Sequence, residues 1–286
     1  MSIFKIGVLS DAFGLGFKGD IEKAREVGAE AVQVYAVRGE MAPENLTAAD
    51  IAEKKQILAD NGMKISALCG DPGGHGFTNA EMNVERIAMS KRVVDLGLEL
   101  GTNIVTTHVG VIPCDKNAES FKIMQEACNE LAEYANDKDA FFAIETGPET
   151  ADTLKMFLDS LSSKGVAVNL DPANFVMVTG DDTVKAVYTL KDYIVHTHAK
   201  DGRRFQPIDP RVLYGALQHD AIPDWAEYFA ELPLGEGDVD WDNYLKALNE
   251  IGFNGYLTIE REVGENPTAD IAMAVKFLEA KIAKMA

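Results

Sequence analysis

The sequence predicts a closed (β/α)8 barrel, also called a TIM barrel, that forms one domain over residues 1–286. Three observations predict it: eight short apolar runs recur along the chain, segments with helical spacing separate most of them, and 47% of the residues are apolar. Strands that alternate with helices pair in parallel through crossover connections. Eight such units favour a closed barrel over an open sheet, and no GxGxxG motif follows the first run to indicate a dinucleotide fold.

The expected elements follow one another in a regular order. The predicted strands are 4–10, 29–37, 63–69, 103–110, 140–147, 165–171, 192–199 and 255–262. Helical spacing of apolar residues predicts helices at 47–62, 83–101, 119–137, 241–252 and 268–285, several of them closed by Gly or Asn. Residues 202–239 interrupt this order with a connection far longer than a usual βα loop, so we expect a lid or a binding segment there.

Composition and charge narrow the classes of function. The chain has 27 Lys and Arg against 46 Asp and Glu, a formal net charge of −19, which repels nucleic acid and anionic membranes and can be offset in part by a bound cation. No run of about 18 apolar residues predicts a membrane span, and the N-terminal stretch does not resemble a signal peptide. Cys69, Cys114 and Cys128 have no close-spaced pair, so we expect reduced thiols and a cytoplasmic protein.

Polar residues at the carboxyl ends of four consecutive strands share the inward parity of a barrel interior. They are Glu145, Asp171, His198 and Glu260. Each of them alone also fits a solvated loop or turn position, but independent turn residues have no reason to share parity and barrel end. Three carboxylates converging in an interior need a divalent cation to offset their repulsion. Mostly oxygen donors with one imidazole favour Mn²⁺, Mg²⁺ or Co²⁺, and Zn²⁺ also stays open.

The stretch HTHAKDG, residues 196–202, holds further candidates. His198 is level with the three carboxylates and is the expected ligand. His196 lies one pleat deeper, about 6.6 Å down the strand, so we expect it to support the site from below rather than to bind the same ion. Lys200 and either Arg203 or Arg204 are expected to face the substrate. On the fourth strand, His108 points inward by the same count.

Several motifs carry a resemblance to a known family. They are THVGVIP, AIETGPE, NLDPANF, HTHAKDG, PLGEGDVDW and GYLTIERE, which span residues 104–262. In this order they resemble the xylose-isomerase-like TIM barrels, in particular the sugar isomerase and epimerase branch. The resemblance implies a homo-oligomer, with Glu145, Asp171, His198 and Glu260 as metal ligands and the two glutamates as the acid/base pair. Where the family's epimerases often carry a histidine three residues after the aspartate, this chain has Asn174.

The expected reaction is proton transfer next to a carbonyl of a sugar or cyclitol, through a metal-stabilised enediolate. His75, His108, Asn174, Lys200, Arg203 and Arg204 are the candidates for binding the substrate, which could be phosphorylated although no phosphate cradle is identified. A dehydratase or lyase acting on a keto sugar or inosose is the first alternative. A sugar-binding barrel without turnover is another. An endonuclease IV-like DNA repair enzyme is the last, but it would need more histidines, and the acidic charge opposes it.

Overall fold

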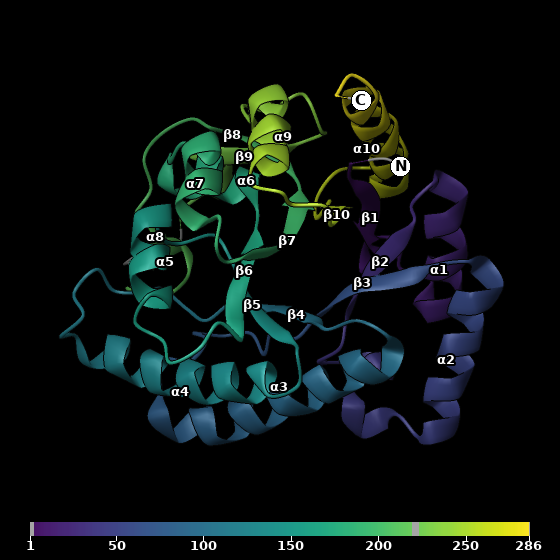
Figure 1. Cartoon of the computed structure of the whole chain (residues 1–286). Coiled ribbons are helices and arrows are strands. Elements are labelled where there is room, and N and C mark those ends of the chain that lie inside the picture. Colours follow the sequence, from purple (N-terminus) through teal and green to yellow (C-terminus); the bar gives the residue numbers. More distant parts are fainter. Residues whose placement is uncertain (1–2, 219–222, 286) are drawn as a thin grey trace.

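Eight parallel strands close into a barrel in the computed structural model, which describes residues 3–218 and 223–285 (Figure 1). Around the barrel the strands follow the order β1, β10, β7, β6, β5, β4, β3, β2. They are β1 Lys5–Leu9, β2 Ala31–Tyr35, β3 Lys64–Cys69, β4 Ile104–Thr107, β5 Phe141–Glu145, β6 Val166–Leu170, β7 Ile194–Ala199 and β10 Tyr256–Ile259. The predicted barrel is confirmed, and each predicted run contains one of these strands.

Helices form an outer layer around the barrel (Figure 1). The longer ones are α1 Gly16–Val27, α2 Ala48–Asn61, α3 Ala80–Leu100, α4 Glu119–Asn136, α9 Trp241–Glu250 and α10 Pro267–Ala283. The shorter ones are α5 Ala151–Leu158, α6 Pro172–Asn174, α7 Thr183–Leu190, α8 Pro210–Leu213, a π-helical turn at Phe175–Thr179, and 3₁₀ turns at Ser10–Ala12, Gly39–Met41, Pro43–Asn45 and Trp225–Glu227.

The limits of α2 show how local sequence sets these elements. Thr47 and Asp50 form a reciprocal capping box at its start, in which each side chain accepts a hydrogen bond from the other residue's backbone N–H. Gly62 ends the helix with a φ of +64°, a left-handed conformation that favours glycine.

The apolar core lies between the barrel and the helices, whereas the barrel interior is largely polar. Outward side chains such as Phe142 and Leu257 are fully buried in the layer that also holds Phe157 of α5. The interior instead carries buried polar side chains from several strands: Gln33, Ser66, Thr106, Asn169, His196 and Thr258. Branched apolar residues usually fill such an interior, so the polar set indicates a function inside the barrel.

The barrel register shifts at two places. Between β2 and β3 it shifts at Val32/Gln33, which leaves Ser66 as an extra residue on β3. Between β6 and β7 it shifts at Val168/Asn169, which leaves Val195 as the extra residue on β7. Bulges of this kind redirect side chains next to functional sites. Both shifts coincide with an interior amide side chain, Gln33 or Asn169.

The described part of residues 202–239 contains regular secondary structure where the sequence predicted a loop. β8 Asp201–Arg204 and β9 Phe229–Leu232 form an antiparallel two-stranded sheet beside the barrel, and α8 lies between them in the chain. Residues 219–222 of this segment lie outside the described part of the chain. Its role as a lid stays a prediction.

Asp201 holds this segment against the barrel. Its buried carboxylate accepts hydrogen bonds from the backbone N–H groups of Gly202 at 2.9 Å, Gly235 at 2.9 Å and Val239 at 3.2 Å. It also accepts one from the indole Nε1 of Trp241 at 2.8 Å. One side chain therefore joins the end of β7, the end of the long segment and the start of α9.

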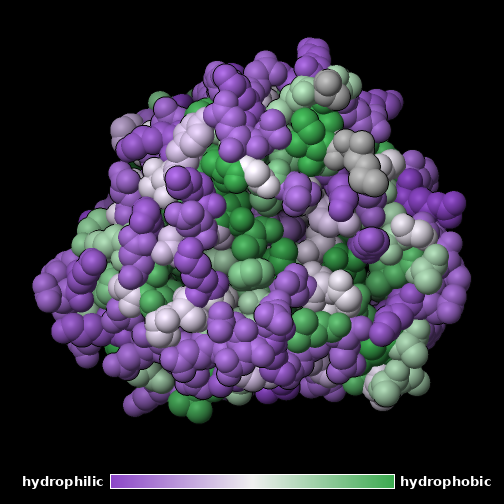
Figure 2. Space-filling model, in the orientation of Figure 1, coloured by the Kyte–Doolittle hydropathy of each residue, from purple (hydrophilic) through white to green (hydrophobic). Residues whose placement is uncertain are grey.

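One face of the molecule is shown as a surface in Figure 2. Hydrophilic residues predominate on this face, while hydrophobic residues gather near its middle. Among the described residues, no helix combines the length and the apolar composition that a transmembrane segment requires.

We predict that Asp201→Ala lowers the free energy of unfolding by about 3 kcal/mol, because buried donors lose a charged acceptor. Urea denaturation measures this loss. The matched control is Asp238→Ala, which removes an exposed carboxylate that pairs with Arg203 and should cost less than about 1 kcal/mol. Equal losses for the two variants would contradict the role assigned to Asp201.

Candidate metal centre

Four buried side chains meet at the carboxyl end of the barrel. Glu145 ends β5, Asp171 follows β6, His198 lies near the end of β7 and Glu260 follows β10. One potential ligand atom from each lies within 4.8 Å of all the others. The Nδ1 atom of His198 is 3.1 Å from Glu260 Oε2, 3.4 Å from Asp171 Oδ2 and 3.5 Å from Glu145 Oε1.

Two atoms of this cluster point at one another without a hydrogen bond. Among the described residues, neither His198 Nδ1 nor Asp171 Oδ2 has a hydrogen-bond partner, and both are buried. On the other edge of the imidazole, His198 Nε2 lies 3.0 Å from the acceptor Gln33 Oε1. Asn169 Nδ2 lies 3.1 Å from the same atom. When the imidazole is neutral with its proton on Nε2, Gln33 Oε1 accepts that proton and the Nδ1 lone pair faces the carboxylates. This is the arrangement of a metal-binding histidine with an oriented outer partner.

The charges of the cluster do not balance by themselves. The three carboxylates contribute −3, and Lys200 does not offset them alone, because its Nζ lies 3.0 Å from Glu260 Oε2 but is also bonded to Glu262 and lies 3.7 Å from Glu231. Burial opposes a charge on His198, but the carboxylates of Glu260 and Glu145 outweigh it and hold the pKa of the imidazole well above its usual range. The cluster therefore attracts positive charge, which a divalent cation would supply.

Asp171 serves two purposes through its two oxygens. Asp171 Oδ1 accepts a hydrogen bond from Asn174 N at 3.0 Å and so caps the turn Pro172–Asn174. The second oxygen, Oδ2, is left facing His198. Burial raises the pKa of Asp171 to about 6. The Asp-Pro turn thus fixes the direction of the carboxylate.

A cavity of about 220 Å³ opens beside the cluster. Its lining includes Gln33, Tyr35, Cys69, Asp71, Thr107, His108, Glu145, Asn174, Lys200, Tyr214, Glu260 and Glu262. His108 Nδ1 lies 3.0 Å from Asp71 Oδ2, and His108 Nε2 lies 3.8 Å from Glu145 Oε1. Burial opposes a charge here too, but these carboxylates raise the pKa of His108 to about 9. The cavity therefore offers a small ligand both carboxylates and cationic donors.

The family model described as "Xylose isomerase-like TIM barrel" matches residues 21–281, most of the chain. The chain belongs to this family. The xylose isomerase-like barrel predicted from the motifs is thereby confirmed.

Three known proteins are similar to the chain. A xylose isomerase domain protein from Planctomyces limnophilus is 24% identical with a TM-score of 0.80, over 98% of this chain and 97% of that one. Inosose dehydratase of Clostridium perfringens is 22% identical over 58% of this chain and 56% of its own length. L-ribulose-5-phosphate 3-epimerase UlaE of Salmonella paratyphi A is 38% identical over 20% of each chain. The chain thus spans about half of the length of the inosose dehydratase and about a fifth of the length of the epimerase.

The other predicted residues of this xylose isomerase-like barrel lie at different distances from the cluster. Asn174 lies beside it, because its Nδ2 donates to Glu145 Oε1 at 3.3 Å. His196 lies deeper, and its Nδ1 is 2.8 Å from Asn169 Oδ1, whose amide nitrogen in turn donates to Glu145 Oε2 at 3.4 Å. Burial holds the pKa of His196 well below its usual range, so this imidazole is neutral.

Neither arginine faces the small cavity, contrary to the expectation for one of them. Arg203 is exposed, and the hydrogen bond of 2.9 Å from its Nε to Asp238 Oδ1 holds the guanidinium outside the small cavity. Arg204 lies over Gly180 and lines a neighbouring cavity. His75 is exposed and is not part of the small cavity's lining.

Several residues that line the small cavity are not among the predicted site residues. Gln33 on β2 and Asp71 after β3 fit the parity and strand-end rules that located the other residues, so the same count extended to these strands would have found them. Tyr214 lies in the long segment, where no periodic pattern marks an inward residue. Its hydroxyl packs against Gly147, where an added Cβ would lie 2.6 Å away.

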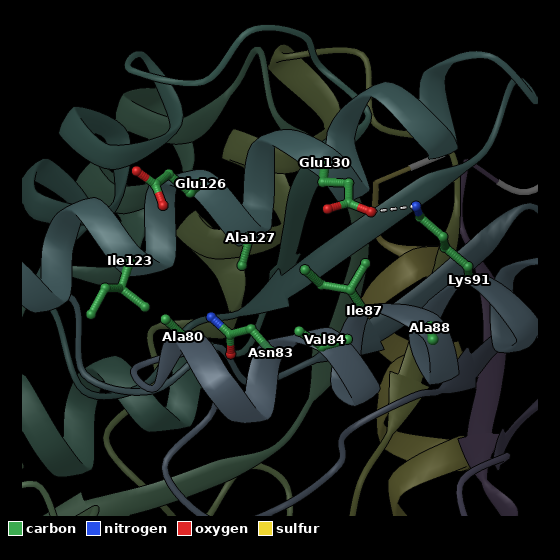
Figure 3. Close-up of a pocket in the computed structure, with 10 residues that line it drawn as sticks. All are labelled: Ala80, Asn83, Val84, Ile87, Ala88, Lys91, Ile123, Glu126, Ala127 and Glu130. Atoms are coloured by element: carbon green, nitrogen blue, oxygen red, sulfur yellow. Dashed lines mark hydrogen bonds and ion pairs between the residues drawn. The ribbon is translucent and has the colours of Figure 1, made fainter.

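A further hollow of about 380 Å³ lies between α3 and α4, away from these residues (Figure 3). It is lined by helix side chains, and the ion pair of Lys91 and Glu130, 2.6 Å long, crosses from one helix to the other. It contains no residue of the cluster.

We predict that Gln33→Met weakens Mn²⁺ binding by about 10- to 100-fold, because the imidazole of His198 loses the acceptor that orients it. Calorimetric titration of metal-free protein with Mn²⁺ measures the affinity. Gln56→Met on the exposed face of α2 is the control and should bind as the unmodified protein does. Unchanged affinity in the Gln33 variant would refute this orienting role.

Proposed function

We propose that the protein is a divalent-metal-dependent sugar isomerase or epimerase that moves a proton next to a substrate carbonyl. The observation that carries the proposal is the convergence of three carboxylates on the unpartnered Nδ1 atom of His198. In the proposal, Glu145, Asp171, His198 and Glu260 hold the cation. Mn²⁺ is the first choice, and Mg²⁺, Co²⁺ and Zn²⁺ are the alternatives.

Several residues around the small cavity have a part in the proposed reaction. A bound divalent cation would polarise the substrate carbonyl as a Lewis acid. Glu145 and Glu260 act as the acid/base pair that removes the proton from carbon and returns it. His108, held by Asp71, donates a hydrogen bond to a substrate oxygen.

Lys200 stabilises negative charge that develops on the substrate. Its ammonium group is buried and lies beside Glu260, with Glu231 3.7 Å away and Glu262 also bonded. Burial opposes the charge, but Glu260 and the neighbouring carboxylates hold the pKa of Lys200 well above its usual range, which keeps it a cation.

A dehydratase or lyase that uses the same site is the second candidate. The match to inosose dehydratase over 58% of this chain favours it, since elimination starts with the same removal of a proton next to a carbonyl. The endonuclease IV-like alternative is weaker, because the described cluster contains one histidine and His75 lies outside it. We also propose that the protein is a homo-oligomer, which the resemblance favours. A cytoplasmic location is proposed from the cysteine pattern.

We expect the protein supplied with Mn²⁺ to exchange a substrate proton for deuterium in D₂O, in a panel of ketoses and keto-inositols followed by NMR. Glu260→Gln should lower the rate by about 10²- to 10⁴-fold, since a carboxamide cannot accept the proton. Glu265→Gln, an exposed neighbour, is the control and should retain the rate. Absence of exchange with every member of the panel would overturn the enzyme proposal.

Metal binding should release a proton near pH 7. The raised pKa of His198 keeps its imidazole charged in the metal-free protein, and a ligand imidazole must be neutral. Mn²⁺ affinity should therefore fall as the pH is lowered. Calorimetry in buffers of different ionisation enthalpy counts the protons, with His75→Gln as the control. Binding without proton release would contradict the assignment of His198 as a ligand.

A further inference from the structure

More carboxylates than cationic groups line the small cavity beside the cluster. The carboxylates are Asp71, Glu145, Glu260 and Glu262, and the side chains that can carry a positive charge are His108 and Lys200. A divalent cation would add positive charge only at the cluster, where Asp171 contributes a further carboxylate. The cavity therefore stays negative on balance even with a cation bound.

Both cationic groups of the cavity already face carboxylates. His108 Nδ1 lies 3.0 Å from Asp71 Oδ2, and its Nε2 lies 3.8 Å from Glu145 Oε1. Lys200 Nζ donates to Glu260 Oε2 at 3.0 Å and is also bonded to Glu262. A phosphate group in this cavity would have to displace a carboxylate to pair with either cation.

Glu262 places one of these carboxylates at the mouth of the cavity. Its backbone N–H donates to Glu231 Oε1 at 3.1 Å, and its Oε2 accepts the bond from Lys200, so both its backbone and its side chain are held. Its side chain is nevertheless 55% exposed, against 6% for that of Glu260. A ligand that enters the cavity therefore meets a charged oxygen at its edge.

The neighbouring cavities do not supply a net positive charge either. A cavity of about 410 Å³ shares Tyr35 with the small one and is lined by one arginine and three acidic residues: Arg38, Asp11, Asp20 and Glu40. Lys54 pairs with Glu40 at 2.7 Å, which still leaves two carboxylates for one guanidinium. The cavity of about 680 Å³ beside α8 is lined by two arginines and three acidic residues: Arg204, Arg211, Asp115, Glu149 and Asp209.

Hydroxyl groups suit this environment better than a phosphate group. They donate hydrogen bonds to carboxylates, whereas a phosphate dianion only accepts them and is repelled by like charge. The volume of about 220 Å³ is below the range of about 300–1,000 Å³ that is usual for drug-sized ligands, so the cavity suits one small ring.

We propose that the substrate is an uncharged sugar or cyclitol, and that Glu262 is the residue that disfavours its phosphorylated counterpart. The carboxylate repels a phosphate group at the mouth of the cavity, and it also occupies Lys200, a cation to which a phosphate would bind. This inference rests on the proposed function, because the substrate is the molecule on which the cluster would act.

The test uses three pairs of ketoses that differ only in a phosphate group: D-fructose, D-tagatose and D-ribulose, each with its terminal phosphate ester. Wherever either sugar of a pair binds, calorimetry of the Mn²⁺-loaded protein should show the uncharged one binding about tenfold or more tighter. One carboxylate about 6 Å from a dianion in water has an effect of this size. Equal or tighter binding of a phosphorylated sugar in any pair would overturn the inference, as would failure of all three uncharged sugars to bind.

Glu262→Gln should reduce this preference by about tenfold, because it removes the charge and frees Lys200 for a phosphate. Glu262→Asp keeps the charge and should keep most of the preference. Glu265→Gln, exposed and three positions away, is the matched control and should leave the preference unchanged. If Glu262→Gln weakens both sugars of a pair equally, Glu262 has a structural role only and its assignment is wrong.

Ionic strength gives a second measure that a structural role would not change. Because an exposed carboxylate acts through solvent, raising the salt concentration from about 0.05 M to about 0.5 M should reduce the preference of the unmodified protein. The remaining preference of Glu262→Gln should depend less on salt. A preference that responds to neither salt nor Glu262 would contradict repulsion at the mouth of the cavity.

Deuterium exchange separates this inference from the proposed function. Exchange into phosphorylated ketoses but not into their uncharged partners would leave the proposed function standing and refute the inference. Tighter binding of the uncharged sugars without exchange into any of the six would refute the proposed function and leave the selection by Glu262 standing.

Discussion

The repulsion among Glu145, Asp171 and Glu260 around the imidazole of His198 is the constraint on which the barrel interior depends. Three buried carboxylates stay close together only if each is held and their charge is offset. The polar interior does the holding: Gln33 lies against His198, and Asn169 links Glu145 to His196. Since these groups occupy the barrel axis, the apolar packing lies between the strands and the helices.

Strand alternation explains why much of the cluster could be predicted from the sequence. The period of two along a strand does not depend on pairing with its neighbours, so Glu145, His198 and Glu260 follow from the apolar residues around them. Gln33, between the buried Val32 and Val34, follows the same rule.

The parts of the site that the sequence did not reveal come from residues 202–239. The path of this segment depends on Asp201, whose carboxylate bonds to groups about 40 positions apart from it, such as Trp241. No local pattern encodes such contacts. For this reason no sequence signal places Tyr214 at the small cavity. For the same reason the expectation that Arg203 or Arg204 lies there is wrong, because Arg203 pairs with Asp238 and Arg204 lines the neighbouring cavity.

The two register shifts divide the barrel into half-barrels. Between them, β3 to β6 pair without a shift, and β7, β10, β1 and β2 do the same on the other side. Glu145 and Asp171 belong to the first half, whereas His198 and Glu260 belong to the second. A cation bound by all four would link the two halves. Because it would bind only the closed barrel, it would stabilise the folded state in addition to any part in a reaction.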